Sequence, residues 1–574
     1  MREGSRDGGR SAPRAKARWT FVIAVAGCGL LTGKAVAQDA NSPAFDDLKR
    51  MVALQQEQIR ELQAQAAANR QAPIAAAPQA GPVPAQPVGY DSAPAAVAGA
   101  PPAASLGLPP GATIVTNDRT PLTASWNNGV VIESANKEFS VHLGGRMEWD
   151  AGTYDAPRST ITELRALNNS PTSPGNANGF QNFQDNIDFR RARLRADGTI
   201  YDNIDFICEA EFAGSFAVVR PSRTAAGTLN VAAANSTIAN PANLIDAITP
   251  TWVECTVKNI PVLGNVMTGQ FLVPFSFDLA TSDEYTQFIE RSAAFDVFVP
   301  QSGEGNFAQG VEFFDTNEAQ TATWWNSLTT NTDNDPFNGI ALANDAFSWI
   351  GRATWLPYYD EASGGRYLVH VGINGQAQGL ERDVINFHDR GDVHEPYAIT
   401  PSYVNQNVVG TYSEMVCPEL VAVWGPWCFE SEYYAMEVNG SNFAGTGKGN
   451  FGHFFDGAYA QVSYFLTGEN MTYVRTRAAF TRVTPYENFF NLPGERTHCG
   501  LGAWQVAARY SFVDLNDQGV HGGNLDEFTA GLNWYLNPNM HYAFNYCYTH
   551  VSGLGAAGAS ESINGFGVRM TMNF

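Results

Sequence analysis

The residues with the clearest chemistry in this chain are charged side chains that alternate with apolar ones along two consecutive segments. The arginines of the first segment are Arg191, Arg193 and Arg195, and the glutamates of the second are Glu209 and Glu211. Alternate side chains of a strand point to opposite faces of a sheet, so each charged set shares one face. With a turn centred on Asp202, Arg195 lies opposite Glu209, and Arg193 lies opposite Glu211. The pattern predicts either a salt-bridge network that stiffens a wall or a track for anions.

The elements that hold such rows must be strands with one apolar face, and the C-terminal segments show this pattern most clearly. The last segment has a small, polar face, and its apolar face carries Phe566, Val568, Met570, Met572 and Phe574. An edge strand of a soluble sandwich is the alternative for this segment alone, but the pattern recurs at 502–512, 526–536 and 540–549. Repeated alternation with aromatic residues near the segment ends is typical of outer-membrane barrels, whose apolar face meets lipid. A sheet that spans lipid has to close, because an open edge leaves backbone groups unpaired.

Composition sets the size of such a barrel. The chain has 574 residues, 12% of them aromatic, and beyond the N-terminus it has no apolar run long enough for a spanning helix. Segment 124–574 supplies about 16 to 18 strands at about 25 residues per strand and loop, and barrels of this size leave an aqueous channel. The predicted fold class is all-β, a transmembrane antiparallel β-barrel of about 16 strands. Its lumen is predicted to be lined by the two charged rows together with Arg146, Arg509 and Arg569.

The N-terminal third predicts an exported chain with a short extension before the barrel. Residues 1–37 have basic residues, an apolar run and a small-residue cleavage motif, as a secretory signal peptide does. Acylation of Cys28 is the alternative to cleavage after Ala37. Residues 38–70 have the apolar spacing of a short coiled coil, or else form a disordered amphipathic stretch, and 71–123 are an Ala/Pro-rich linker. A coiled coil this short needs a trimeric or similar body to hold it together.

Charge and motifs argue against nucleic-acid binding and catalysis. Removing residues 1–37 takes away seven of the 35 Lys and Arg and two of the 57 Asp and Glu, which leaves a net charge of −27. No nucleophile elbow, phosphate-cradling loop or zinc helix is present, so we predict no enzyme activity, no cofactor and no metal site. One charge run is either a metal cluster or, as its polar context favours, a solvated loop: His388, Asp389, Asp392, His394 and Glu395.

Six cysteines follow the signal peptide, and in an oxidising compartment an even number invites pairing. Cys417 and Cys428 flank what reads as a loop, so a disulfide between them and two free thiols are equally favoured. Cys208 and Cys255 fall on apolar faces and are predicted to act as small hydrophobic residues.

Several short motifs occur in order between residues 126 and 574. They are DFRRARLR at 188–195, GQF and VPFS within 269–276, FIERS at 288–292, AYAQVSYFLTGE at 458–469 and the strand pair within 502–538. Together they resemble the phosphate-selective porin O and P family. The resemblance implies an outer-membrane porin, a homotrimer of sixteen-stranded barrels in the lipid bilayer, each with a long loop folded inward. It also implies that the barrel assembly machinery recognises Phe574 as an assembly signal.

The chain departs from the family where selectivity is set. The resemblance implies lysines on the inward loop, yet the candidate loop at 277–301 has one cation, Arg291, and its acids are Asp278, Asp283, Glu284, Glu290 and Asp296. Leu272 stands where many relatives carry lysine. Carboxylates in a narrow lumen repel a phosphate dianion. We therefore predict passive diffusion of small hydrophilic solutes and ions, anions such as phosphate included, with weak selectivity. A plugged barrel with a structural or adhesive role is the alternative.

Overall fold

The structure is a computed structural model, and its described part begins in the strands of the predicted barrel. The residues described are 122–168, 183, 185–213, 222–223, 229–230, 248–299, 306–330, 347–380, 384–389, 391–393, 403–489, 500–554 and 559–574. The chain divides into two compact units, Met1–Thr113 and Ile114–Phe574. The predicted signal peptide, coiled coil and nearly all of the linker therefore lie outside the described residues. In the described part, no helix is both long enough and apolar enough to cross a membrane.

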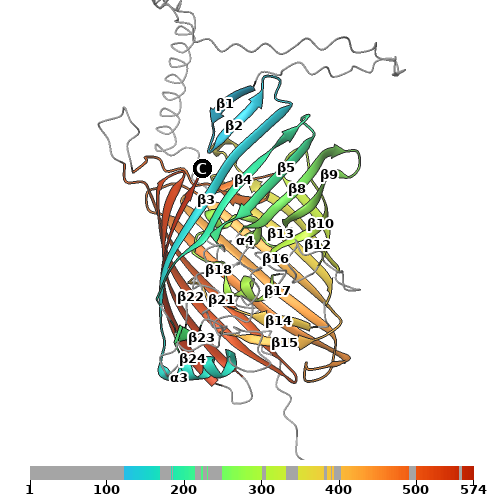
Figure 1. The fold of residues 1–574 in the computed structure, drawn as a ribbon, viewed down its shortest axis with the longest axis vertical. Coiled ribbons are helices and arrows are strands. Elements are labelled where there is room, and N and C mark those ends of the chain that lie inside the picture. The colour runs from blue at the N-terminus through green and yellow to red at the C-terminus, as the bar shows by residue number, and fades with distance from the viewer. Residues whose placement is uncertain are drawn as a thin grey trace, which may run out of the picture. The chain divides into compact units, whose positions relative to one another are not determined.

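Sixteen of the described strands form one closed antiparallel sheet, which confirms the predicted fold class (Figure 1). In chain order they are β3 (Phe139–Asp155), β4 (Asn186–Ile200), β5 (Ile204–Glu211), β8 (Thr249–Ile260), β9 (Gly264–Leu272), β10 (Phe307–Thr316), β11 (Ala322–Thr330), β12 (Phe347–Tyr359), β13 (Tyr367–Gly379), β16 (Tyr412–Trp424), β17 (Trp427–Ser441), β18 (Lys448–Phe465), β21 (Ala503–Asp517), β22 (Val520–Asn537), β23 (Met540–Leu554) and β24 (Ala559–Asn573). A hairpin of β1 (Leu122–Trp126) and β2 (Val130–Ser134) extends the start of β3.

The sheet closes where the last strand pairs with the first strand of the barrel. β24 runs antiparallel to β3 with Arg569 opposite Asp150 and Met572 opposite Met147. The ladder continues to Phe574, whose backbone N–H donates to Gly145 O at 2.9 Å and whose carbonyl accepts from Gly145 N at 2.8 Å. Closure gives every strand two neighbours, which is what a lipid environment demands of backbone polar groups.

The two faces of the closed sheet differ as the alternation predicts. On β24, Phe566 and Phe574 are exposed on the outside, whereas Arg569 and Thr571 are buried on the inside. On β4, Leu194 is 54% exposed while Arg191 is 7% exposed. The apolar outer face and polar inner face are typical of a barrel with a wet interior.

The two ends of the barrel differ in the length of their connections. One end has the tight turns at 201–203, 261–263, 425–426 and 538–539, and there the C-terminus lies beside β1 and β2 (Figure 1). The opposite end has long connections, which include α3 (Arg158–Asn168) and the hairpin of β14 (Val384–His388) and β15 (Asn405–Val409). Outer-membrane barrels have short periplasmic turns and long extracellular loops. The tight-turn end is therefore the periplasmic end, and residues 466–502 are a long connection at that end.

Aromatic rings on the outer face gather near the periplasmic end of β12 to β23. Trp427 packs against Tyr464 with ring centroids 4.6 Å apart, and Trp504 stacks on Trp534 with centroids 5.1 Å apart. Tyr358 on β12 lies 5.9 Å from Trp424. Such a row marks the interface between lipid and water, where aromatic residues place a ring in the apolar layer and a polar atom near water.

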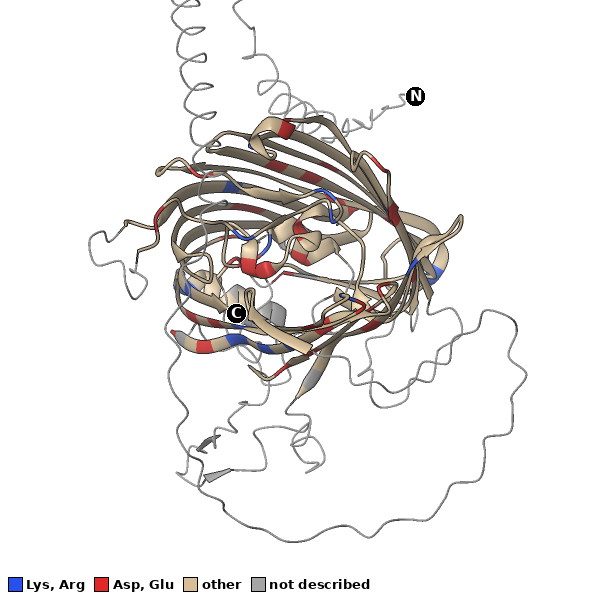
Figure 2. Cartoon of the chain, turned by 90° about the horizontal axis from the view of Figure 1, so that it is seen from above, with Lys and Arg blue, Asp and Glu red and all other residues tan. Residues whose placement is uncertain are grey.

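Much of the interior is filled by chain segments that enter from both ends, as Figure 2 shows inside the ring of strands. One apolar cluster joins α5 (Ala293–Phe298) and the β14–β15 hairpin to the inner wall, with Phe298 near Phe387 at 5.8 Å. A second joins Phe277 to Tyr473 and Phe480 of the long periplasmic connection. A sixteen-stranded barrel is too wide for wall side chains alone to fill, so connections complete its core.

Deleting Phe574 should lower the amount of folded barrel in the outer membrane several-fold. The deletion removes the last backbone pair with Gly145 and an exposed aromatic ring, and it shortens the closing seam. Heat-modifiable barrel in outer-membrane fractions is the measurement. Phe528→Ala, which removes a similarly exposed ring from the middle of β22, is the control and should stay near wild type. Equal levels for the two variants would contradict a special role of Phe574.

Candidate channel constriction

The connection between β9 and β10 folds into the barrel and is described from Val273 to Val299. It contains α4 (Phe277–Ala280), a short 3-10 turn at Asp283–Tyr285 and α5. Its first turn is held by the inner wall, since Phe277 N donates to Glu432 Oε1 at 2.6 Å and Ser276 N donates to Asn374 Oδ1 at 2.9 Å. The predicted constriction loop therefore does enter the lumen.

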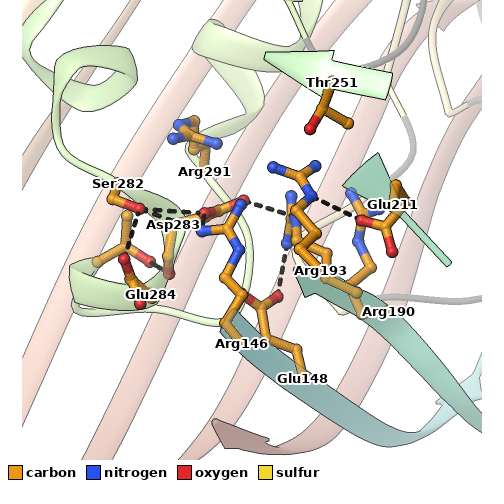
Figure 3. A network of polar contacts seen from close by, with 12 residues as sticks. Arg146, Glu148, Arg190, Arg193, Glu211, Thr251, Ser282, Asp283, Glu284 and Arg291 are labelled. Atoms are coloured by element: carbon orange, nitrogen blue, oxygen red, sulfur yellow. Dashed lines mark hydrogen bonds and ion pairs between the residues drawn. The ribbon is translucent and has the colours of Figure 1, made fainter. Parts of the chain in front are cut away.

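Two acids of this loop contact the arginines of β3, β4 and β24, and Figure 3 shows Asp283 beside Arg146 of β3. Asp283 forms ion pairs with Arg146 and with Arg191, the latter at 2.6 Å from Nε to Oδ2. Glu290 pairs with Arg190 at 3.1 Å and with Arg569 at 2.7 Å. Two of the carboxylates that the sequence suggested would repel phosphate thus act as counter-charges of the wall.

The ionisation of two loop acids differs because their surroundings differ. Burial raises the pKa of Asp278, whose nearest cation, Arg291, is 3.8 Å away. Burial also acts to raise the pKa of Asp283, but Arg146 and Arg191 outweigh it and hold that pKa well below its usual range. Asp283 is therefore ionised while it contacts the wall arginines.

A β-bulge adds a wall cation that alternation alone does not predict. In the register of β4 with β3, Arg191 lies opposite Glu148 and Phe189 lies opposite Trp149, so Arg190 has no residue opposite it on β3. A bulge turns the extra side chain to the other face. Arg190 and Arg191 therefore both reach the interior, where Arg190 contacts Glu290. The sequence signal was the pair of consecutive arginines, which breaks the alternating pattern.

The predicted register of the β4–β5 hairpin is confirmed. Arg193 lies opposite Glu211, and Arg195 lies opposite Glu209. The ion pairs are staggered relative to this register, because Arg193 contacts both glutamates, at 2.7 Å to Glu211 and 3.1 Å to Glu209. Arg195 instead pairs with Asp197 at 2.8 Å and lies over the ring of Trp252.

Two of the predicted lining arginines are buried anchors of the loop. Arg509, 3% exposed, forms an ion pair with Asp392, donates to the carbonyls of Glu290 and Arg291 at 3.0 and 3.2 Å, and stacks on Phe288. Arg569, also 3% exposed, binds both oxygens of Asp150 at 2.7 Å. Both face the interior, but their guanidinium groups are occupied by protein.

The remaining predicted residues of the loop are also engaged. Arg291 donates to the carbonyls of Asp278 and Thr281, both at 3.0 Å, and so fastens the loop to itself. Glu284 accepts from Asn573 Nδ2 at 2.9 Å. The single cation that the sequence placed at the constriction is therefore a structural clamp.

A second segment enters the lumen from the periplasmic end, and sequence reasoning missed it. Within the connection 466–502, β19 (Thr472–Val474) and β20 (Ala479–Thr481) form a hairpin. The wall holds it through Arg352, which donates to Ala478 O at 2.8 Å, and through His370, whose Nδ1 lies 2.8 Å from the hydroxyl of Tyr473. Its only signal in the sequence was the unusual distance between two predicted strands.

Two expectations about side chains in this region need correction. The charge run around Asp389 and Asp392 is not a solvated loop, because both are 1% exposed, and Asp392 accepts from Thr529 Oγ1 at 2.5 Å. His394 and Glu395 lie outside the described residues. Within the described ranges, no group of three or more His, Cys, Asp or Glu is arranged to hold a metal ion.

The disulfide between Cys417 and Cys428 is also not formed. Both residues lie on strands, β16 and β17, with buried side chains and free thiols, so the predicted loop there was wrong. Cys208 and Cys255 are free and exposed on the outer face, as small residues on an apolar face.

Comparisons with known proteins point to one family. The family model of phosphate-selective porin O and P matches residues 172–574. Porin O of Pseudomonas aeruginosa is 22% identical over 489 residues, which cover 80% of this chain and 94% of that protein. An uncharacterized protein of Caulobacter vibrioides is 25% identical over 484 residues, 79% of this chain and 78% of that one. Among solved structures, the anion-selective porin from Comamonas acidovorans is similar with a TM-score of 0.42 and 11% identity, over 76% of this chain and 100% of that one.

Replacing Asp283 by Asn should make the channel more anion-selective. The change removes the negative charge between Arg146 and Arg191, so the positive charge of both guanidinium groups is less compensated. At such short separations we expect the chloride-to-potassium permeability ratio to rise about twofold or more. The reversal potential in a potassium chloride gradient across a planar bilayer measures this ratio.

Glu284→Gln is the matched control, because Glu284 follows Asp283 on the same turn and its carboxylate accepts hydrogen bonds from Asn573 and Ser282. Its effect should be smaller. A shift of Asp283→Asn toward potassium, or no shift, would show that Asp283 does not balance the wall.

Proposed function

This chain belongs to the phosphate-selective porin O and P family, and we propose that it forms a broad diffusion channel without a tight phosphate site. It is an outer-membrane porin whose barrel passes small hydrophilic solutes and ions, and membership of the family makes phosphate and other anions candidate solutes. The observation that supports weak selectivity is that the wall arginines are paired with carboxylates.

The proposed water path follows the inner faces of β3 to β9. The interior beside β11 to β23 is filled by the two apolar clusters, so water has little room there. The inner faces of β4 and β5 instead carry charged side chains, and those of Arg195 and Asp197 are 26% and 29% exposed. We propose Arg146, Arg191, Arg193, Arg195, Glu209 and Glu211 as its lining, with the loop acids narrowing it.

Pairing explains why this lining would select weakly. An anion site needs several donors that converge on one oxyanion, and guanidinium groups that already hold carboxylates have few donors left. Arg191 contacts both Glu148 and Asp283, and Arg193 contacts both Glu209 and Glu211. A neutral network with alternating charge gives solutes a polar path without a deep well for phosphate.

We also propose a homotrimer that is joined through the outer faces of β3 to β5. Small residues there alternate with the charged rows, among them Ala192, Ala196, Gly198 and Ala210. Such a surface lets another barrel approach closely, and the aromatic row of β12 to β23 faces lipid instead. The trimer that the family resemblance implies would place these small residues at its centre.

Ala196→Trp should abolish heat-resistant trimers while leaving folded monomers. A tryptophan is too large for a packed interface, but lipid accommodates it. Ala353→Trp is the control, since Ala353 is exposed on the outer face of β12, inside the proposed lipid-facing surface. Seminative gel electrophoresis with and without heating measures the oligomer. Intact trimers in Ala196→Trp would place the interface elsewhere.

Purified wild-type protein should give discrete conductance steps whose chloride current is insensitive to millimolar phosphate. Block by micromolar phosphate would restore a specific site and overturn the broad-channel proposal. A folded barrel with no conductance steps would instead favour the plugged, structural or adhesive role, because two segments already fill much of the lumen.

A further inference from the structure

The periplasmic connection crosses the mouth of the barrel, and its residues 475–482 are here called the strap. At one end Arg475 donates to the carbonyl of Gln320 at 2.9 Å and pairs with Glu361 at 2.6 Å, in the turns after β10 and β12. At the other end Arg482 donates to Asn573 Oδ1 on β24 at 2.8 Å. Phe480 N donates to Thr281 Oγ1 of the inward loop at 3.2 Å, which joins the two lumenal segments.

The anchors of the strap frame one part of the mouth. Around the barrel, β3, β4, β5, β8 and β9 lie between β24 and β10. The strap therefore faces the same strands that we propose as the water path. Solutes that leave along this path pass between the strap and the inner wall of β4.

Arg477 is the exposed arginine of the strap. It lies in the tight turn between β19 and β20, where its N–H donates to Val474 O at 3.3 Å. Its neighbours Arg475 and Arg482 are held by the wall, whereas Arg477 is exposed and forms no ion pair with a residue that the structure describes. This distinguishes it from the wall arginines of the constriction.

Arg195 stands on the opposite side of this opening. Burial and then the positive charge of Arg195 lower the pKa of Arg477, while Tyr285, Asp197 and Glu284 act in the other direction. These are the charges that face Arg477 from β4 and from the inward loop. Asp197 is ion-paired with Arg195, whereas Arg477 forms no ion pair with a residue that the structure describes.

We propose that Arg477 sets the ion preference of this channel at its periplasmic mouth, as a charge filter separate from the neutral constriction. The inference rests on the proposed water path along β3 to β9. An unpaired cation in a narrow opening raises the local concentration of anions and lowers that of cations. Because the charge lies at one end only, its effect depends on the direction of the current.

Arg477→Glu tests this by reversing the charge without altering a contact that holds the strap. We expect the chloride-to-potassium permeability ratio to fall about threefold or more, and the current–voltage curve to change its asymmetry. Lys137→Glu makes the same charge change in the exposed turn between β2 and β3 and should leave the ratio near wild type. A ratio for Arg477→Glu equal to that of the control would overturn the proposal.

Chemical modification after folding separates a charge effect from a folding defect. Arg477→Cys in the bilayer should become more anion-selective with a cationic methanethiosulfonate reagent and more cation-selective with an anionic one, added at the periplasmic side. Wild-type protein reports the background, since its described cysteines are buried or face outward. Discrete conductance that neither reagent changes would refute the role of Arg477 and leave the porin function intact.

Discussion

The constraint on which this structure depends is that hydrocarbon offers no partner to a backbone N–H or C=O. An unpaired group there costs several kcal/mol, so the sheet has to close, and the seam between β24 and β3 closes it. Closure in turn fixes the alternation of side chains along every strand. The outer residues have to suit lipid, and the inner residues have to suit each other, water and the connections that fill the lumen.

The interior raises the opposite problem, because charges placed there need partners. Burying an arginine without a counter-charge is costly, and breaking a buried pair typically costs about 3–5 kcal/mol. The inward loop supplies Asp283 and Glu290 to arginines from β3, β4 and β24. These ion pairs explain why the loop is acidic. A lysine-rich loop would be repelled by the arginines of the wall.

The parts of the fold that follow from local pattern were predictable, and those that depend on distant contacts were not. The alternation of β21 to β24 and the pairing of Arg193 with Glu211 depend only on strand geometry and on one turn. The bulge at Arg190 interrupts the alternation of side chains along β4, so strict alternation places Arg190 on the outer face and misses its contact inside the barrel. The strap and the buried Asp392 depend on where long connections fold, which no periodicity encodes. The loop predicted between Cys417 and Cys428 was wrong because Pro418 and a Gly-Pro pair suggested it, whereas they lie within and between two paired strands.

Selectivity in such a lumen is decided by the charges that remain unpaired, rather than by the number of charges on any one segment. Asp283 retains its charge because its folded-state pKa is depressed, so its contribution to docking is present above the usual pKa of aspartate and is lost only as the pH falls through the depressed value. The ion pairs of Asp283 with Arg146 and Arg191 are therefore retained across the physiological range. Where paired charges leave little net field in the constriction, the ion selectivity depends mainly on the charges at the mouth of the channel. Counting loop carboxylates alone suggested only that the loop repels phosphate, but the pairing of Asp283 and Glu290 with wall arginines removes much of that field. The proposed filter at Arg477 would then act on ions at the mouth of the channel.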